Sequence, residues 1–209
     1  NPLGVVIMYS NILLEEVASG SPLEEDLQLI VTQAERCKNI VGGLLNFARK
    51  NQVQYHEVNV QEMISTSISS IIIPPAIQLK VTDKLDNAYA ELDQEQVIQV
   101  ISNLVKNAIE AMDEEGSIEV VLEDPGEDLV ITIRDTGKGI NEEDLDKIFE
   151  PFFTTKGIGM GTGLGLATAY GIVKMHKGKI SVTSNADPLK GETGTSFVIE
   201  IPRHRKLAN

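Results

Sequence analysis

The sequence predicts an α+β chain in which an N-terminal helical hairpin is followed by a two-layer α/β sandwich. Before residue 51, apolar residues recur in a strict four-three rhythm, the period of a coiled coil or helical bundle. After residue 58, strand-like runs alternate with helical patterns, which is typical of helices packed on a mixed sheet. The change of pattern predicts two domains, residues 1–52 and residues 57–205.

The composition limits the kinds of partner and the compartment that we expect for the chain. The 209 residues carry a formal charge of −13 at pH 7, which argues against nucleic-acid binding because phosphate attraction needs a basic face. No apolar run approaches the length that spans a bilayer, so a membrane is expected only through parts outside this chain. The chain has one cysteine, Cys37, which cannot form an internal disulfide and therefore fits a reducing compartment. Cys37 falls on the predicted helical seam, so we expect it to be a small core residue. We therefore expect a cytoplasmic chain.

The N-terminal region predicts two antiparallel helices. The turn-forming run 18–22 separates them, and Pro22 suits the first turn of a new helix. The predicted seam consists of Leu3, Ile7, Ser10, Leu14 and Val17 in the first helix and Leu23, Leu27, Ile30, Ala34, Cys37, Val41, Leu44 and Ala48 in the second. One hairpin buries little surface, so two copies are expected to pair into a four-helix bundle.

The second region predicts strands and helices in mixed order. A long helix is expected over residues 93–114, with Asp93 as its N-cap and Gln96 three residues later as in a capping box. The remaining expected elements are strands within 71–81 and 88–92, a hairpin of 118–123 and 129–134, a glycine-rich loop over 150–163, a helix over 164–176, and strands at 180–184 and 195–201.

Polar residues form a narrow stripe along the helix predicted at 93–114. Gln99, Asn103, Asn107 and Glu110 share this stripe, opposite an apolar arc. Asparagine is a poor helix former, and two of them on successive turns suggest a role other than helix stability. Amide oxygens suit a hard cation such as Mg²⁺, although an ordinary solvated face is the alternative.

Two glycine runs are the most informative motifs. Residues 135–139 read Asp-Thr-Gly-Lys-Gly after a predicted strand, and residues 161–166 read Gly-Thr-Gly-Leu-Gly-Leu before a predicted helix. Bare backbone N–H groups at such positions attract anions such as phosphate. Taken singly, each run is equally compatible with a tight turn.

Together these motifs resemble the sensor histidine kinases of two-component systems, with a dimerisation hairpin and a GHKL-type ATP-binding catalytic domain, in the nitrogen-regulation-like subgroup. The resemblance covers nearly the whole chain. Its motifs, in the order of the family, are the N box at 103–108, the G1 box at 135–140, the F box at 149–153, the G2 box at 161–166, and Gly194-Thr195.

The resemblance implies a role for each matching residue. Asp135 would accept a hydrogen bond from the adenine amino group, and Gly137 and Gly139 would let the backbone approach the ring. Thr195 would contact the adenine, directly or through water. Asn107 would ligate the Mg²⁺ that bridges the phosphates. The residues expected on the phosphate side are Asn103, Lys156, Gly161, Gly163, Leu164 and Gly165, with an ordinary exposed lysine as the alternative for Lys156.

Asn103 separates reaction types within the wider resemblance. In gyrase-type and chaperone ATPases a glutamate at this place activates water, whereas an asparagine cannot act as a base. The resemblance therefore implies a site that holds ATP for another nucleophile. Glu110 stands where many histidine kinases carry a lysine. It is open whether it affects phosphate contacts, serves the metal's water shell or is merely exposed.

The family's acceptor histidine precedes an Asn-Pro-Leu motif, which matches Asn1-Pro2-Leu3. The match places that histidine and its neighbouring glutamate before Asn1, so no catalytic residue is expected within this chain. His56, His176 and His204 are each expected to be surface residues.

We therefore expect the cytoplasmic core of a protein-histidine kinase that binds ATP and Mg²⁺, dimerises through its hairpin and serves a response-regulator receiver domain. Three alternatives stay open. They are an anti-sigma-type serine kinase, a gyrase-like ATPase, and a dimerisation module whose nucleotide site is vestigial.

Overall fold

A computed structural model describes residues 2–49, 52–112, 115–157 and 161–204, with the backbone alone for residues 36 and 39–49. The chain divides into two compact units. One comprises Asn1–Lys50 with Pro151–Leu164, and the other comprises Asn51–Glu150 with Gly165–Asn209. Each unit is described by itself.

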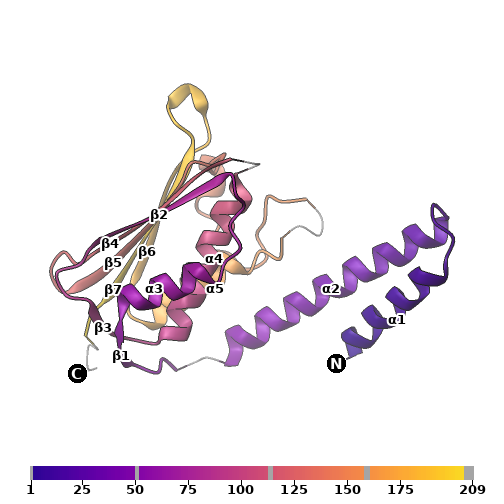
Figure 1. Ribbon diagram of the computed structural model, residues 1–209, viewed down its shortest axis with the longest axis horizontal. Helices are drawn as coiled ribbons and strands as arrows, with labels where there is room; N and C mark the ends of the chain where they lie inside the picture. The colour runs from indigo at the N-terminus through magenta and orange to yellow at the C-terminus, as the bar shows by residue number, and fades with distance from the viewer. Residues whose placement is uncertain (1, 50–51, 113–114, 158–160, 205–209) are drawn as a thin grey trace. The chain divides into compact units, whose positions relative to one another are not determined.

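The first unit contains the helical hairpin formed by α1 (Pro2–Glu16) and α2 (Pro22–Arg49), as the heptad rhythm predicts (Figure 1). Ser10, Leu27 and Ala34 are buried where the two helices pack together. The prediction for Cys37 is wrong for the single chain, because this cysteine is exposed. The reason is that a helix with a wide apolar arc contacts only one neighbour here, so part of its seam stays uncovered.

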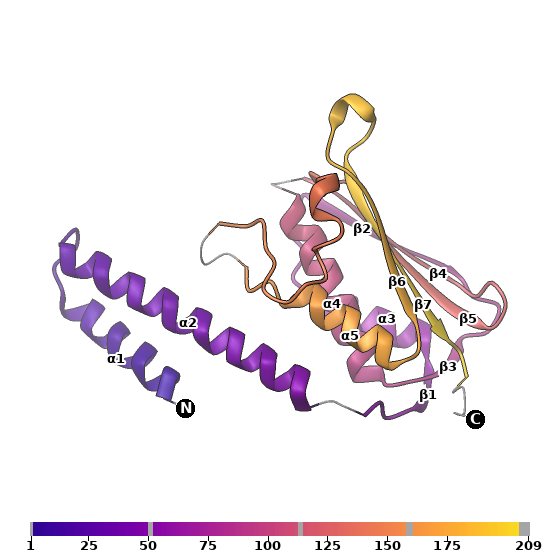
Figure 2. The same cartoon turned by 180° about the vertical axis from the view of Figure 1, so that it is seen from behind.

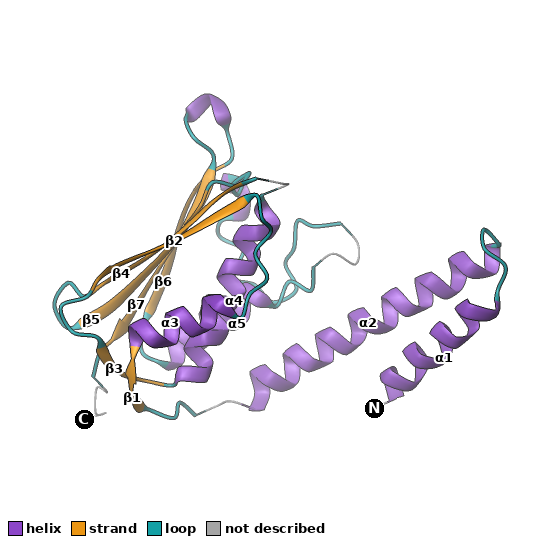
Figure 3. Cartoon of the chain, viewed as in Figure 1, coloured by secondary structure: helices purple, strands orange, loops and turns teal. Residues whose placement is uncertain are grey.

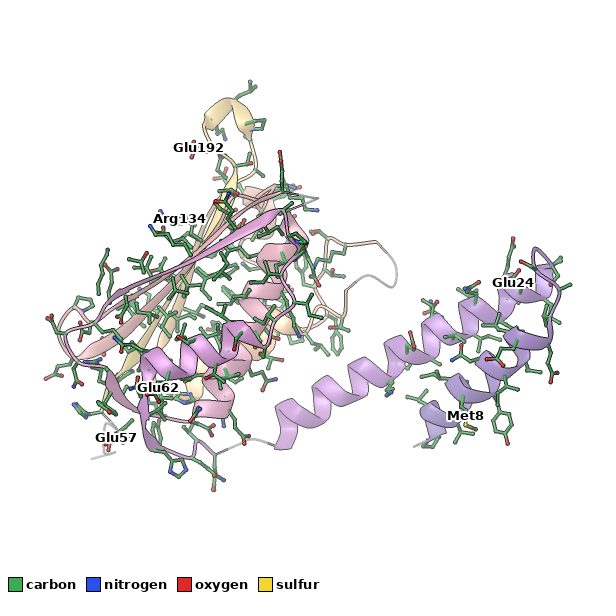
Figure 4. All side chains as sticks on the ribbon, viewed as in Figure 1. Met8, Glu24, Glu57, Glu62, Arg134 and Glu192 are labelled. Atoms are coloured by element: carbon green, nitrogen blue, oxygen red, sulfur yellow. The ribbon has the colours of Figure 1, made fainter. Side chains whose placement is uncertain are left out.

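An apolar face of the hairpin remains exposed in the single chain. Met8 projects from α1, as Figure 4 shows, and its side chain is 50% exposed in the single chain. Apolar side chains of both helices share this exposure, and they include Val5, Tyr9, Ile12, Leu23 and Ile30. Within the described parts of the chain, no helix has the length and apolar character needed to cross a membrane.

The second unit is built on a five-stranded sheet with the order β2-β4-β5-β7-β6. Its strands are β2 (Ile77–Lys84), β4 (Gly116–Glu123), β5 (Asp128–Asp135), β6 (Lys179–Asn185) and β7 (Gly194–Pro202). Strand β2 pairs parallel with β4, whereas the other neighbours are antiparallel. The predicted β4–β5 hairpin is confirmed.

Helices of this unit cover one face of the sheet, which gives the predicted two-layer sandwich (Figures 2 and 3). They are α3 (Val60–Ser69), α4 (Gln94–Ala111) and α5 (Gly165–Met175). The core lies between the layers, where Ile101 and Leu104 of α4 face the buried rows of the central strands. Arg134 lies on the uncovered face of the sheet (Figure 4).

Helix α4 begins where the sequence predicts. The Asp93 side chain accepts a hydrogen bond from the Gln96 backbone N–H at 3.1 Å, which satisfies one of the free donors of the first turn. The return half of the expected capping box is replaced. The Asp93 N–H donates to His176, and the Gln96 amide donates to the carbonyl oxygen of Gln52 at 3.4 Å.

The strand and the helix that precede β2 were not predicted. Strand β1 (His56–Asn59) pairs antiparallel with β3 (Tyr89–Leu92), and helix α3 follows β1 directly. Serine, threonine and β-branched residues make α3 a poor helix by propensity. Burial compensates for this, because Val60, Met63, Ile64 and Ser67 follow helical spacing and are all buried.

Candidate functional site

Asp135 ends β5 as a buried carboxylate that is 5% exposed. Its Oδ1 accepts hydrogen bonds from the backbone N–H of Gly137 at 2.9 Å and of Thr195 at 3.2 Å. In the described ranges no donor contacts Oδ2. Burial raises the pKa of Asp135, and the two N–H groups oppose that shift. The second oxygen is therefore an acceptor available to a ligand.

The loop after Asp135 passes so close to its neighbours that side chains do not fit. Gly139 has φ +73°, and a Cβ there would lie 2.1 Å from the carbonyl oxygen of Asn185. A Cβ on Gly137 would lie 2.8 Å from the carbonyl oxygen of Ala111. The Lys138 N–H also donates to Ala111 at 3.0 Å, so the loop is fixed to the end of α4. Glycine here serves close backbone approach as well as the turn.

Thr195 lies next to Asp135 on the neighbouring strand. The two residues are register partners between β5 and β7, and Thr195 is 5% exposed. Its hydroxyl contacts the Ser184 hydroxyl of β6 at 2.9 Å. Sequence reasoning missed Ser184, because nothing in the run 180–185 distinguishes it from other strand serines. Only the cross-strand register places it beside Thr195.

The polar stripe of α4 divides into two roles. The Asn103 side-chain amide donates to the carbonyl oxygen of Gly165 at 3.0 Å, which joins α4 to the first residue of α5. Asn107, one turn later, is half-buried, and its side chain has no hydrogen-bond partner among the residues described. The Asn107 side-chain oxygen is therefore available as a metal ligand, whereas the Asn103 amide N–H is already used in the hydrogen bond to Gly165.

The segment Pro151–Leu164 belongs to the other compact unit, so only its internal geometry is described. Phe152 has φ +71°, which is uncommon for a non-glycine residue, and its N–H donates to the carbonyl oxygen of Gly163 at 2.9 Å. A Cβ on Gly163 (φ +64°) would lie 2.4 Å from the Phe152 carbonyl carbon. Gly161 lies against Thr154, whose hydroxyl accepts from the Lys156 N–H at 3.2 Å. Leu164 donates its N–H to the Thr162 hydroxyl at 3.4 Å.

His176 is the clearest correction to the sequence prediction. It was expected at the surface, but it is 2% exposed at the end of α5. Its Nε2 accepts the Asp93 N–H at 3.1 Å, while Nδ1 lies 2.9 Å from the Ile172 carbonyl oxygen. Burial lowers the pKa of His176, against the hydrogen bond to Ile172 and the charge of Asp93. The imidazole is thus a neutral structural group, whereas His56 and His204 are exposed as expected.

The donor set also limits how a metal ion can bind. In the described residues no group of three or more His, Cys, Asp and Glu side chains could hold a metal. Asn107 supplies a single neutral oxygen, which fits Mg²⁺ because this ion keeps waters and phosphate oxygens as most of its ligands. A single Asn107 oxygen fits a cation whose other ligands are water and the phosphate oxygens of a bound molecule.

Comparison with known proteins identifies the family. Residues 92–205, more than half of the chain, match the family described as histidine kinase-, DNA gyrase B-, and HSP90-like ATPase. The chain belongs to this ATPase family. The matched region runs from the end of β3 past β7 and contains Asp135, Asn107 and Thr195.

Similar proteins include a sensor histidine kinase and a sporulation kinase. The chain is 32% identical over 206 residues to the sensor histidine kinase ZraS of Salmonella typhimurium (strain LT2), which covers 97% of this chain and 43% of ZraS. It is 32% identical over 208 residues to sporulation kinase A of Bacillus subtilis (strain 168), with 97% of this chain and 32% of that protein covered. The chain thus spans less than half the length of these curated relatives.

Solved structures agree with the fold. The catalytic domain of histidine kinase ThkA superposes with a TM-score of 0.59 and 34% identity over 72% of this chain and 97% of that domain. The structure of ThkA in complex with the response regulator protein TrrA gives a TM-score of 0.66 at 27% identity over 97% of this chain and 58% of that one. The predicted α+β fold and the histidine-kinase type of ATPase domain are confirmed, whereas the subgroup stays a prediction.

Proposed function

We propose that this chain is the cytoplasmic kinase core of a sensor histidine kinase, in which residues 57–205 bind Mg-ATP and residues 1–52 form the dimerisation hairpin. The observation that carries the proposal is the Asp135 carboxylate, whose Oδ1 is occupied by two backbone donors while Oδ2 is open. Such an acceptor suits the amino group of adenine, because a charge-assisted hydrogen bond in a buried site is selective as well as strong.

Residues at and just beyond the ends of the strands bind and orient the nucleotide. Asp135 accepts from the base, Thr195 lies beside it, and Gly137 and Gly139 allow the loop to lie flat against the ring. The N–H groups of Gly161, Gly163 and Gly165 bind the phosphates, and Leu164 belongs to the same phosphate-binding run. Gly165 suits this role because it begins α5, and a helix N-terminus attracts anions. Lys156 neutralises charge on the terminal phosphate.

Asn107 holds the cation that accompanies the phosphates. Its amide oxygen has no competing partner in the described chain, and it lies one turn from Asn103 on the same stripe. When bound, Mg²⁺ supplies charge neutralisation at the phosphate oxygens. The residues of the chain position the nucleotide and its cation and exclude water from the phosphates.

The site holds ATP for transfer to an external nucleophile. Asn103 cannot take a proton from water, and its amide donor is already committed to Gly165. Hydrolysis therefore lacks a general base at this position. In the longer protein the nucleophile is a histidine on the bundle helix, from which the phosphoryl group passes to an aspartate of a response-regulator receiver domain.

Dimerisation is supported by the uncovered face of the hairpin. Four apolar side chains are about half exposed in the single chain, and a second hairpin would cover them. They are Val5 (50%), Tyr9 (59%), Leu23 (55%) and Ile30 (46%). The complex of the relative ThkA with a response regulator supports a receiver domain as the partner of the dimer.

The experiment incubates a form extended beyond Asn1, and separately this chain alone, with ATP labelled on the γ-phosphate. The extended form should acquire an acid-labile, base-stable label typical of phosphohistidine, and this chain should stay unlabelled. Rapid release of free phosphate would indicate a gyrase-like ATPase, and an acid-stable label on a partner would indicate a serine kinase. Either result, or a label on this chain's own histidines, contradicts the proposal.

A further inference from the structure

Three polar side chains lie in one cross-strand row, at the same edge of three neighbouring strands. Asp135 of β5 is the register partner of Thr195 of β7, which is in turn the partner of Ser184 of β6. Asp135 and Thr195 continue strand faces that are otherwise buried and apolar, toward the helices. The row therefore lies at the polar end of the core, where Asp135 presents its open oxygen.

Ser184 has all of its hydrogen-bonding capacity in use. Its hydroxyl donates to the Gly194 carbonyl oxygen at 2.8 Å and accepts from the Ile140 N–H at 2.8 Å. A serine hydroxyl has one proton and two lone pairs, so a single lone pair remains for Thr195, whose Oγ1 lies 2.9 Å away. All three contacts are satisfied together only when Thr195 donates its proton to Ser184.

This arrangement fixes what Thr195 can offer to a ligand. With its proton directed at Ser184, its Oγ1 retains only lone pairs, so Thr195 acts as an acceptor next to the acceptor Oδ2 of Asp135. Two neighbouring acceptors favour an amino group and disfavour a carbonyl oxygen, because a buried acceptor facing another acceptor stays unpaired.

We propose that Ser184 is a positioning residue for base selection: it orients the Thr195 hydroxyl as an acceptor, and it holds the 137–140 loop through Ile140, so that the site distinguishes 6-amino from 6-oxo purines. The inference rests on the proposed function, because it concerns the base of the bound nucleotide. Ser184 acts through Thr195 and the loop and need not touch the ligand.

The test measures dissociation constants of Mg-ATP and Mg-ITP by calorimetry for the wild type, Ser184→Ala and Ser184→Thr. Ser184→Ala should weaken ATP binding by about tenfold, the factor for one lost hydrogen bond of about 1.4 kcal/mol, with a smaller change for ITP. Ser184→Thr keeps the hydroxyl and should restore the ratio. Thr183→Ala is the matched control, since Thr183 is the neighbouring exposed residue of β6.

A second variant separates positioning from a loss of fold. Thr195→Val removes the acceptor itself, so it should lower the ATP-to-ITP preference as Ser184→Ala does, and the double variant should lower it no further. An unchanged preference in Ser184→Ala, or an equal loss in Thr183→Ala, overturns the inference alone. A wild type that binds neither nucleotide overturns the proposed function and the inference together.

Discussion

The side-chain amide of Asn103 donates a hydrogen bond to the carbonyl oxygen of Gly165 at 3.0 Å. This contact links the polar stripe of α4 to the start of α5, the helix that follows the second glycine run. It places a neutral amide, whose N–H donor is already in use, at the position where the resemblance to gyrase-type ATPases implies a general base. The same residue therefore has a structural role and a chemical consequence.

Removal of this contact should destabilise the second unit. Asn103→Ala removes the side-chain donor to the Gly165 carbonyl oxygen, so the free energy of unfolding should fall by about 1 kcal/mol, the worth of an ordinary hydrogen bond. Urea denaturation measures the change. Gln99→Ala, one turn earlier on the same half-buried stripe, is the control. Equal losses in the two variants would mean that the Gly165 contact contributes nothing particular.

The role of Asn107 predicts an effect that depends on the metal. Asn107→Ala should weaken ATP binding by about tenfold in the presence of Mg²⁺, equivalent to about 1.4 kcal/mol. In EDTA the variant and the wild type should bind ATP equally, because the lost oxygen serves the cation. Parallel calorimetric titrations with and without Mg²⁺ measure both affinities. A loss of the same size in EDTA would assign Asn107 to structure or to direct nucleotide contact.

His176 predicts how stability depends on pH. Burial keeps its pKa below the ordinary value of 6.5, and its Nε2 accepts the Asp93 N–H only when the ring is neutral. Just below pH 6.5 the His176 imidazole binds a proton in the unfolded chain but stays neutral in the folded chain. Stability is therefore full above pH 6.5 and falls as the pH drops through the folded pKa.

Urea denaturation between pH 8 and pH 5 measures this dependence. His176→Gln should flatten the part of the curve below pH 6.5, while His56→Gln should leave it unchanged because His56 is exposed. A wild-type slope that survives in His176→Gln would assign the effect to other groups.

The exposed hairpin face predicts a dimer that one charge can disrupt. Ile30 is 46% exposed, and Ile30→Lys would place an ammonium group in the proposed bundle core. Sedimentation velocity should give a dimer for the wild type and a monomer for this variant. Glu25→Lys, at an exposed polar position of α2, should remain a dimer. A monomeric wild type would contradict dimerisation through this chain.

Local patterns were sufficient to predict much of this fold and its site. The heptad rhythm predicted α1 and α2, the Asp93 cap predicted the start of α4, and the glycine runs led to Asp135 and its loop. Each of these features depends on neighbours in the sequence, on turn chemistry or on helical periodicity.

What the sequence could not predict depends on distant partners. Helix α3 has weak propensity and forms because its apolar face is buried. His176 is buried beside the N-cap of α4, far away in the chain, and accepts the Asp93 N–H there. Ser184 matters only through the pairing of β6 with β7. In each case tertiary packing decides the role of a residue that is locally unremarkable.

The recognition of the base by Asp135 is the central claim, and Asp135→Asn tests it most directly. The asparagine can keep its oxygen toward the N–H groups of Gly137 and Thr195, which leaves an amide donor facing the ligand. Because burial raises the pKa of the carboxyl, its ionisation costs stability near neutral pH, so the unliganded variant should be no less stable. A calorimetric titration with Mg-ATP should show affinity reduced by at least about tenfold, the lower range for a charged hydrogen bond. Equal affinity of the folded variant and the wild type for ATP would contradict the account.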